Sequence, residues 1–463
     1  MASLSRQLAQ WVANLRYEDL PPEVIDRAKG VTLHNLISAL IGSQTSGGKD
    51  AVSFVTEEES STKNGATVLV NGAKVTKTAA AYANTEMMRT GGKLDSYRML
   101  THPGTTIIPG ALVAAETNGA SGRDFITGIA AGYEVMGRIA GDFIPTLMSR
   151  GFHPSPVFGL FGAAVAAAKI LRMTEEQVNA AIGFCVSLAS SNVEGPHSGG
   201  RALREGAAAR NAVFAVSLAQ RGHPGGETVL EGKSGFYHSY IGNNFGKLAY
   251  SFTGETQSSL EKVTAGLGKD WLFLETLYRI YSIAGYNIAH VAIAAKLCEE
   301  NDIKYEDIDR IEAMVNWLET QYPSPAFPHR TEYGPAQAGG TAYYTAFGAV
   351  KRGFPLERGV GANASGPDTP KEVLDLMKRV TIIPLHEMTL FGPRITIFTK
   401  DGKSYTQQGT GREFVWDFEE EVRRMREVTP VLPISAQKFE SLIATCRDLE
   451  KAERADKLIQ LTL

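Results

Sequence analysis

Five stretches rich in alanine and glycine follow one another through the middle of the chain, and they constrain its fold more than any other feature. Each has the length and apolar spacing of a helix, and small side chains at helical spacing let helix axes approach closely. The stretches are Ile108–Thr117, Gly122–Arg138, Gly159–Leu171, Thr174–Leu188 and Gly206–Gln220. Thr174, with Gln177 three residues later, has the form of a capping box at a helix start. The sequence therefore predicts a compact core made only of helices.

Further helices are expected before this core. Met1–Leu15 is amphipathic with a period near 3.6, and Pro21-Pro22 opens an apolar segment that runs to Gly42. Ala51–Glu57 and Thr76–Met88 are also helical in pattern. Between them, the Asn71-Gly72 pair after a short apolar run predicts a small hairpin.

The pattern changes between Gly266 and Lys400. Helical and strand-like patterns occur together in this region. In chain order they are Ile280–Cys298 (helix), Ile308–Trp317 (strand), Ala342–Gly353 (helix), Val380–Pro384 (strand) and Ile395–Thr399 (strand). Beyond them Phe418–Met425 and Ser435–Leu463 are again charged amphipathic helix. We predict a mainly α fold with an α+β insertion: a helical domain of residues 1–265 and 401–463, and a smaller α+β lid domain of residues 266–400.

Composition excludes several classes of function. Of 463 residues, 43% are hydrophobic and 21% charged, and the formal net charge is −3, so nothing favours binding to nucleic acid or to an anionic membrane. No apolar run is long enough to span a bilayer, and the first 15 residues lack the pattern of a secretory signal. The three cysteines, Cys185, Cys298 and Cys446, are far apart and lie in apolar or helical segments. This pattern predicts reduced, buried thiols. A cytoplasmic location is the expectation.

Several familiar site patterns are absent from the sequence. Gly232-Lys233-Ser234 and Gly402-Lys403-Ser404 lack the first glycine of a P-loop. The chain has no Gly-x-Ser-x-Gly elbow, no His-Glu-x-x-His, no Cys-x-x-Cys pair and no Rossmann fingerprint after a strand. Acid–base chemistry by side chains, without an evident cofactor or metal, remains.

Lys93–Gly104 is the stretch with the densest set of such side chains. It holds Asp95, Tyr97 and His102, and it ends in a Pro-Gly pair that fixes a turn. A carboxylate and an imidazole brought together by a rigid turn suit general acid–base catalysis. Taken alone, however, the stretch is more typical of a solvated loop between helices than of a catalytic site.

Three other polar stretches join it. Arg150–Gly159 fixes His153 between Phe152 and a proline at a helix start. Glu194–Gly206 carries two arginines three residues apart, a spacing that suits a carboxylate clamp. Tyr278–His290 lies where the helical region meets the α+β segment, a place where clefts form. For each stretch the alternative is purely structural: a core histidine or a surface arginine.

In this order, the four stretches resemble the MmgE/PrpD family. The segment from Gly151 to Ala164 is similar to the family's Gly-Trp-His-Pro-Thr followed by a Gly/Ala-rich helix, Val229–Phe236 is a second match, and Leu94-Asp95 with His102 resembles its acidic motif and following histidine. The resemblance implies a large all-α domain, a smaller α+β lid and usually a homodimer. It also implies cofactor-free chemistry on a small di- or tricarboxylate in the cleft between the domains, as in 2-methylcitrate dehydratase, cis-aconitate decarboxylase and iminodisuccinate epimerase.

Carried onto this sequence, the resemblance assigns roles to nine residues. Those expected to be catalytic are His102, His153, Asp95 and Tyr97, and those expected to bind substrate are Arg201, Arg204, Arg279, Tyr281 and His290. The sequence also departs from the family. Ser96 stands where a second Asp is common, and arginines stand where the family has lysine or histidine. Because arginine stays charged, it can hold an anion but is a poor proton carrier.

Three hypotheses follow. The first is a lyase that dehydrates or decarboxylates a polycarboxylate of the 2-methylcitrate or cis-aconitate type. The second is a cofactor-independent epimerase or isomerase of a dicarboxylate, with one acid and one base on opposite faces of a carbon. The third is a family member that binds an anion without catalysis, which the replaced lysines and second Asp would explain.

Overall fold

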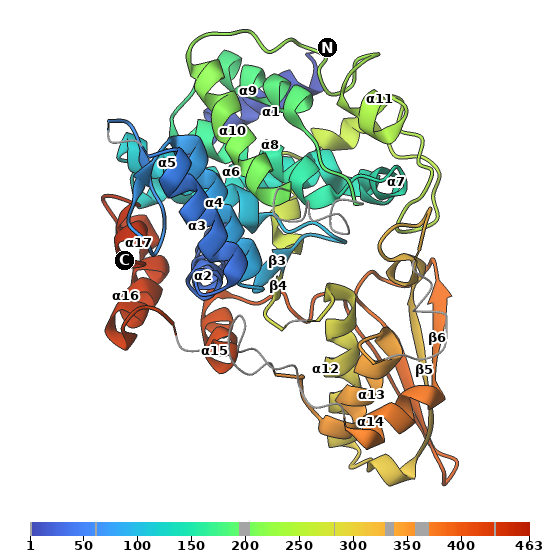
Figure 1. The fold of residues 1–463 in the computed structure, drawn as a ribbon. Helices are drawn as coiled ribbons and strands as arrows, with labels where there is room; N and C mark the ends of the chain where they lie inside the picture. The colour runs from blue at the N-terminus through green and yellow to red at the C-terminus, as the bar shows by residue number, and fades with distance from the viewer. Residues whose placement is uncertain are drawn as a thin grey trace.

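A body of helices makes up the larger part of the molecule, and a smaller unit with a four-stranded sheet extends from one side of it (Figure 1). The computed structural model describes residues 2–60, 63–193, 204–281, 283–328, 338–356, 370–429 and 432–463. Within them, no helix combines the length and apolar character that crossing a membrane requires.

The helices of the body come from the N-terminal part of the chain and from its C-terminal end. The first part forms α1 (Leu4–Asn14), α2 (Pro22–Gly42), α3 (Ser46–Glu58), α4 (Lys77–Thr90), α5 (Gly104–Asn118), α6 (Gly122–Ala140), α7 (Ile144–Ser149), α8 (Pro154–Ile170), α9 (Glu175–Leu188), α10 (Arg204–Gln220) and α11 (Phe236–Ile241). The last part forms α15 (Phe418–Val428), α16 (Ala436–Arg447) and α17 (Lys457–Gln460). Both α15 and α16 pack on α2, so the two ends of the chain meet in one body.

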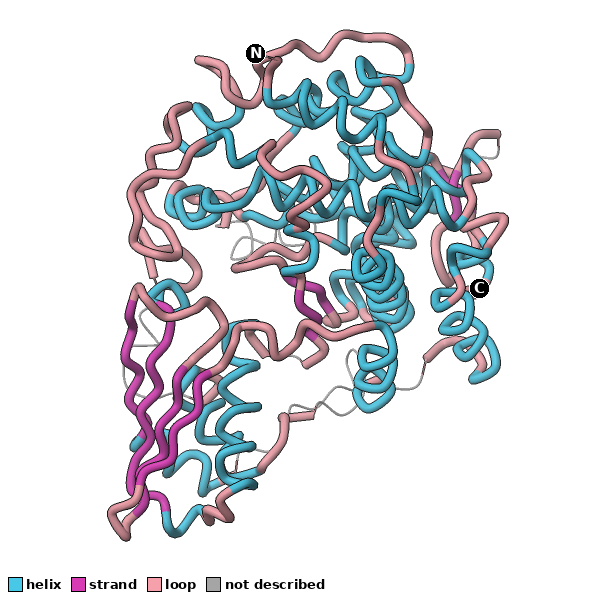
Figure 2. The backbone as a smooth tube through the Cα atoms, turned by 180° about the vertical axis from the view of Figure 1, so that it is seen from behind, coloured by secondary structure: helices cyan, strands magenta, loops and turns pink. Residues whose placement is uncertain are grey.

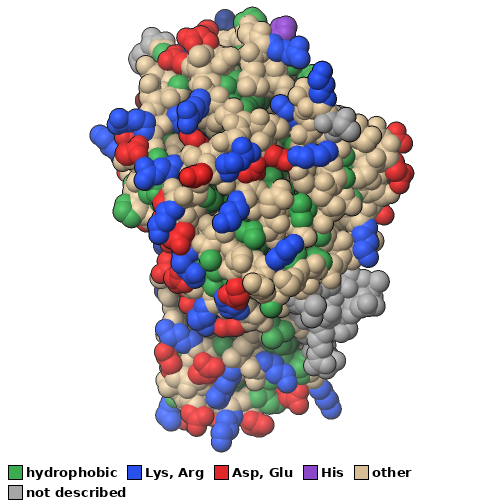
Figure 3. Space-filling view, turned by 90° about the vertical axis from the view of Figure 1, so that its left-hand side faces the viewer, with side chains coloured by type: hydrophobic (Ala, Val, Ile, Leu, Met, Phe, Trp, Pro, Cys, Tyr) green, Lys and Arg blue, Asp and Glu red, His purple; other side chains and the backbone are tan. Residues whose placement is uncertain are grey.

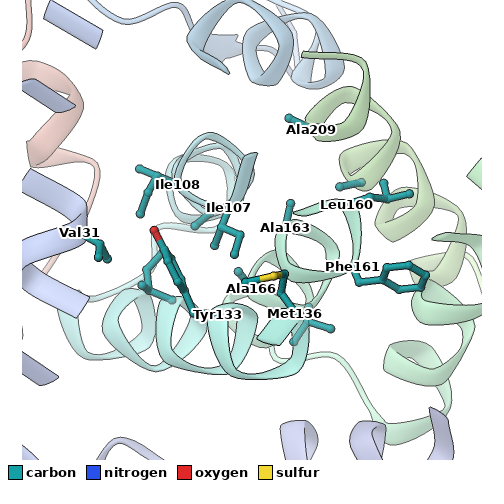
Figure 4. Packing of buried hydrophobic residues seen from close by; sticks show 14 of the residues in the cluster. Val31, Ile107, Ile108, Tyr133, Met136, Leu160, Phe161, Ala163, Ala166 and Ala209 are labelled. Atoms are coloured by element: carbon teal, nitrogen blue, oxygen red, sulfur yellow. The ribbon is translucent and has the colours of Figure 1, made fainter. Parts of the chain in front are cut away.

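Small residues allow close packing at the centre of the body, as predicted. Ile107 of α5, Met136 of α6, and Ala163 and Ala166 of α8 lie together and are buried (Figure 4). A Cβ on Gly132 would lie 2.6 Å from the carbonyl oxygen of Gly162, so only glycine fits where α6 crosses α8. The predicted capping box at Thr174 and Gln177 is present at the start of α9.

The predicted hairpin is also present: β1 (Ala66–Thr67) pairs antiparallel with β2 (Lys74–Val75). A second short pair was not predicted. β3 (Leu94–Ser96) pairs antiparallel with β4 (Leu277–Arg279), with Asp95 opposite Tyr278. These two strands lie between the helical body and α12 (Figure 1).

The smaller unit has its own core. Its sheet has the order β6-β5-β7-β8, with β5 (Ile308–Asn316), β6 (Val380–Leu385), β7 (Arg394–Thr399) and β8 (Ser404–Gln408). Three helices, α12 (Gly285–Glu300), α13 (Thr341–Lys351) and α14 (Lys371–Leu376), lie along one face of the sheet (Figure 2). Ile293, Phe347, Val373 and Ile397 belong to a hydrophobic cluster separate from that of the body. A mainly α protein with a mixed α and β part is therefore confirmed.

The strands do not follow the predicted lid boundaries. β8 continues the sheet beyond residue 400, whereas β4 and its neighbours, which follow residue 266, pack on the helical body. The predicted helix over Ile280–Cys298 begins only at Gly285. Cys185, Cys298 and Cys446 are buried free thiols. On the face shown in Figure 3, acidic and basic side chains are mixed rather than gathered by sign.

Candidate active site

A cavity of about 780 Å³ lies where the helical body meets the smaller unit. The body contributes the α2–α3 turn, the end of α4, β3 with the turn after it, His153 and the start of α10. The start of α12, Tyr322 and Phe391 complete the lining from the other side. Polar and charged side chains from segments far apart in sequence include Arg89, Ser96, Arg98, His102, His153, Arg204, Glu205 and Arg279.

Strand alternation decides which residues of β3 reach the cavity. Successive side chains of a strand point to opposite faces, and Leu94 and Ser96 line the cavity while Asp95 does not. Asp95 is fully buried on the other face, where its carboxylate accepts hydrogen bonds from the Tyr133 hydroxyl and from the backbone N–H of Gly104 at 3.0 Å. Burial raises the pKa of Asp95. Asp95 therefore anchors the turn from behind, although we expected it to face the cleft.

The turn after β3 is strained and held from several sides. Arg98 and Leu100 have positive φ values of 49° and 54°, which non-glycine residues rarely adopt. The Tyr97 N–H donates to the Thr101 carbonyl at 2.8 Å, and Arg98 forms ion pairs with Asp142 and Glu275. Strain of this kind is concentrated at functional sites, where the surroundings impose the conformation.

His102 is presented to the cavity as a neutral imidazole of defined tautomer. Its Nδ1 lies 3.0 Å from the carbonyl oxygen of Asp95 and 2.9 Å from Oγ of Ser96. Because a carbonyl only accepts hydrogen bonds, Nδ1 carries the proton and Nε2 keeps its lone pair. Burial, reinforced by the nearby Arg279 and Arg204 guanidinium groups, lowers the pKa of His102 to about 3. At neutral pH His102 is thus a base and not an acid.

His153 reaches the same cavity from α8. It is the residue before the first turn of that helix, and Pro154 begins the helix. The backbone N–H of His102 donates to Oγ of Ser155, in that first turn, at 2.7 Å. This hydrogen bond joins the two polar stretches that the sequence places about 50 residues apart. His102 and His153 consequently line one cavity.

Guanidinium groups form the other part of the lining. Arg279 ends β4, opposite Leu94, and Arg204 begins α10. Arg89, at the end of α4, was not predicted as a site residue, although its spacing from Glu86 is that of a helical ion pair. Arg201, and the whole segment 194–203, lie outside the described residues.

Besides Asp95, three predicted site residues are not among the described residues that line the cavity. Tyr97 is buried and donates to the Gly137 carbonyl at 3.3 Å. Tyr281 stacks on Phe354 with ring centroids 3.8 Å apart. His290 is fully buried within the smaller unit, its Nδ1 lies 2.9 Å from Oγ1 of Thr345, and burial lowers its pKa to about 3. His290 thus fits the alternative of a core histidine, whereas Tyr97 and Tyr281 pack in the hydrophobic cluster of the body.

A family model for the MmgE/PrpD N-terminal domain matches residues 6–247, more than half of the chain. The chain belongs to the MmgE/PrpD family. The matched region includes β3, the turn that carries His102, His153 and the start of α10. The resemblance predicted from the sequence is therefore confirmed.

Relatives of this MmgE/PrpD chain are named for one activity. A cis-aconitate decarboxylase-like protein of Aspergillus oryzae is 26% identical over 294 residues, which cover 61% of this chain and 59% of that protein. The cis-aconitate decarboxylase of Homo sapiens is 26% identical over 59% of this chain and 58% of its own length. Against the A. oryzae and human proteins, the chain thus spans about three fifths of the relative's length. The Mus musculus enzyme is 24% identical over 100% of this chain and 93% of its own.

The MmgE/PrpD site of this chain contains other residues that sequence reasoning did not predict. Tyr286, Tyr322 and Phe391 line the cavity from the smaller unit, and Glu205 does so from α10. No local pattern distinguishes them, because each reaches the site through tertiary packing. Within the described residues, no group of three or more histidine, cysteine or acidic side chains has the arrangement of a metal site.

Proposed function

We propose that this MmgE/PrpD protein is a lyase that acts on a small tricarboxylate of the cis-aconitate or 2-methylcitrate type, by side-chain acid–base chemistry without a cofactor. The observation that carries the proposal is a neutral histidine beside a cationic wall: His102 offers Nε2 in a cavity that Arg204 and Arg279 also line. The names of the relatives support the substrate class.

The arrangement suits removal of a proton next to a carboxylate. In the proposed reaction, Arg204 and Arg279 hold the carboxylates, and Nε2 of His102 takes the proton from the adjacent carbon. The electron pair left on that carbon spreads into the carboxylate, where the guanidinium groups stabilise the added charge. In dehydration the pair then forms the alkene as hydroxide leaves the neighbouring carbon, and His153 supplies the proton that turns hydroxide into water.

Decarboxylation requires the opposite proton movement. The bond between the carbon and a carboxylate breaks, carbon dioxide leaves, and the resulting carbanion takes a proton from an acid. By itself His102 is not that acid, because burial and the nearby guanidinium groups lower its pKa to about 3. A bound polyanion offsets the charge of Arg279 and raises the pKa of His102, so the substrate itself would create the acid.

One set of assays separates the hypotheses. Purified protein is given cis-aconitate, 2-methylcitrate or citrate, and alkene absorbance, carbon dioxide release and deuterium incorporation from heavy water are followed. We expect a change in alkene absorbance or release of carbon dioxide. Deuterium incorporation without a change in alkene absorbance and without carbon dioxide would indicate an epimerase instead of a lyase. Tight binding of a polycarboxylate without any of these three signals would indicate a non-catalytic anion-binding protein.

A further inference from the structure

Glu86 is the ion-pair partner of Arg89, a guanidinium that lines the cavity. It takes no part in the reaction proposed above. It is 1% exposed and lies on α4, three residues before Arg89. Nε and Nη2 of Arg89 both donate to its Oε2, at 3.0 and 2.6 Å, and the backbone N–H of Gly206 donates to its Oε1 at 3.2 Å. One carboxylate therefore holds both Arg89 and the first turn of α10.

That first turn adds a second carboxylate and a second guanidinium. Glu205 is 3% exposed, its Oε1 lies 3.6 Å from Nη2 of Arg204, and its Oε2 lies 3.9 Å from Nε of Arg89. Arg89, Arg204 and Glu205 all line the cavity. With both carboxylates ionised the four side chains have no net charge, and with one protonated they present one positive charge to the cavity.

We propose that Glu86 is a positioning residue that takes up a proton when a polycarboxylate enters the cavity, so that the binding of substrate and of that proton are linked. Protonated Glu86 no longer neutralises Arg89, and the guanidinium becomes a further cation for a substrate carboxylate. The inference rests on the proposed function, because it needs an anionic ligand in this cavity.

The environment of Glu86 places the pKa of its carboxyl near neutral pH. Burial raises the pKa of Glu86 to about 7, against the lowering effect of the Arg89 guanidinium, and the Glu205 carboxylate raises it further. A bound polyanion adds negative charge nearby and raises the pKa again. The complex therefore holds more protons than the free protein, and the affinity must fall as pH rises through about 7 and above.

Among the described residues, Tyr82 interacts electrostatically with Glu86, and several charged groups on the elements packed against α4 have other partners. Tyr82 lies one turn before Glu86, and burial raises its pKa. Arg210 of α10 pairs with Glu59, Glu116 of α5 pairs with Lys74, and His34 of α2 pairs with Glu421. Within the described residues, the charged side chains of α3 form no ion pair or hydrogen bond with Glu86; they are Lys49, Asp50, Glu57 and Glu58.

Calorimetry with tricarballylate, a saturated tricarboxylate, tests the linkage between about pH 6 and 8.5. Titrations in two buffers of different ionisation enthalpy count the protons taken up on binding. For the wild type we expect proton uptake near pH 7 to 8 and a Kd that rises by up to about tenfold per pH unit above the pKa of Glu86. Glu86→Gln should take up fewer protons and bind more tightly than the wild type at pH 8, with equal affinity at pH 6.

Matched variants keep the test specific. Glu59→Gln removes a carboxylate that pairs with Arg210, which lies farther along α10 than the first turn that Glu86 contacts, and it should keep the wild-type pH dependence. Glu205→Gln removes a group that raises the pKa of Glu86, so the midpoint should move to lower pH. A Glu86→Gln protein that binds more weakly at every pH with an unchanged slope would overturn the proposal and leave Glu86 a purely structural role.

Failure of the proposed function gives a different result. If tricarballylate does not bind to any variant, the substrate class is wrong. Sulfate, which needs only the cationic cavity, then replaces it in the same titrations. Proton uptake with sulfate that disappears in Glu86→Gln would support the linkage, and its absence from the wild type would refute it.

Discussion

Asp95 and Ser96 are neighbours in the sequence but serve opposite sides of β3. Ser96 contacts His102 at the cavity, while Asp95 accepts hydrogen bonds in the core. The sequence could place the pair in the functional region, because the polar stretch ends in a turn. It could not tell which residue faces the cavity, because a strand of three residues shows no period and its partner β4 lies about 180 residues away.

His102→Gln tests the role of the imidazole as a proton carrier. Glutamine can still donate a hydrogen bond to the Asp95 carbonyl, but it cannot take a proton. We expect kcat to fall by about 10²–10⁴-fold, with tricarballylate affinity changed only a few-fold. Because burial lowers the pKa of His102 to about 3, its base form persists to low pH, and wild-type kcat/KM should not decline between about pH 8 and 5 through this residue.

His290→Gln is the matched control, since His290 is a buried histidine that contacts Thr345 away from the cavity. It should lower stability without lowering kcat of the folded fraction. A His102→Gln enzyme with near-normal kcat would remove His102 from the proposed mechanism. So would a fall in wild-type kcat/KM below about pH 6 that is caused by protonation of His102.

Among the elements, the long helices and the β1–β2 hairpin with its Asn-Gly turn were predictable, whereas β3, β4 and β8 were not. Periodicity over a dozen residues or more predicted α1, α2, α6, α8 and α9, and alternation over nine residues predicted β5. β3 and β4 have three residues each and β8 has five polar or aromatic residues. Such strands depend on their partners rather than on their own pattern, so the sequence alone does not reveal them.

Gly132→Ala tests whether the small residues set the distance between α6 and α8. The added Cβ would lie 2.6 Å from the Gly162 carbonyl oxygen and 2.8 Å from Cβ of Ala166. Backbone atoms cannot move aside cheaply, so we expect a loss of about 1–3 kcal/mol in the free energy of unfolding, measured by denaturant titration. Gly110→Ala is the control, because its Cβ would meet Ala163 at 3.4 Å; it should be neutral or stabilising by up to about 1 kcal/mol. Equal losses in both variants would contradict this account.

Tyr133→Phe tests the link between α6 and β3. The variant removes the hydroxyl that donates to the buried Asp95 carboxylate, which then depends on the Gly104 N–H. We expect the free energy of unfolding to fall by about 1–3 kcal/mol. Tyr97→Phe, which removes a longer bond to the Gly137 carbonyl, should cost less. If Tyr133→Phe is the milder of the two, Asp95 does not depend on Tyr133.

At the scale of the whole molecule, the cavity lies between the helical body and the smaller unit, and its apolar lining residues Ile283, Tyr286 and Phe391 belong to the hydrophobic cluster of the body. Arg89, His102 and Arg204 belong to the helical body, while Tyr322 and Phe391 flank the sheet of the smaller unit. The change of pattern near residue 266 and again near 400 indicated two units, and the separate cluster in the smaller unit fits that view. The division into residues 1–265 with 401–463, and 266–400, stays a prediction. β4 lies within residues 266–400 but pairs with β3, and β8 lies after residue 400 but belongs to the four-stranded sheet.

Hydrogen exchange with and without tricarballylate tests whether one ligand engages both units. A ligand that contacts residues of each unit stabilises the closed arrangement of both by mass action. Amide exchange should therefore slow in peptides that contain Tyr286, Tyr322 and Phe391, as well as in those around His102 and Arg204. Peptides of β8, whose residues do not line the cavity, provide the internal control and should exchange at an unchanged rate. Protection confined to the helical body would mean that the ligand binds there alone and that the smaller unit does not act as a lid.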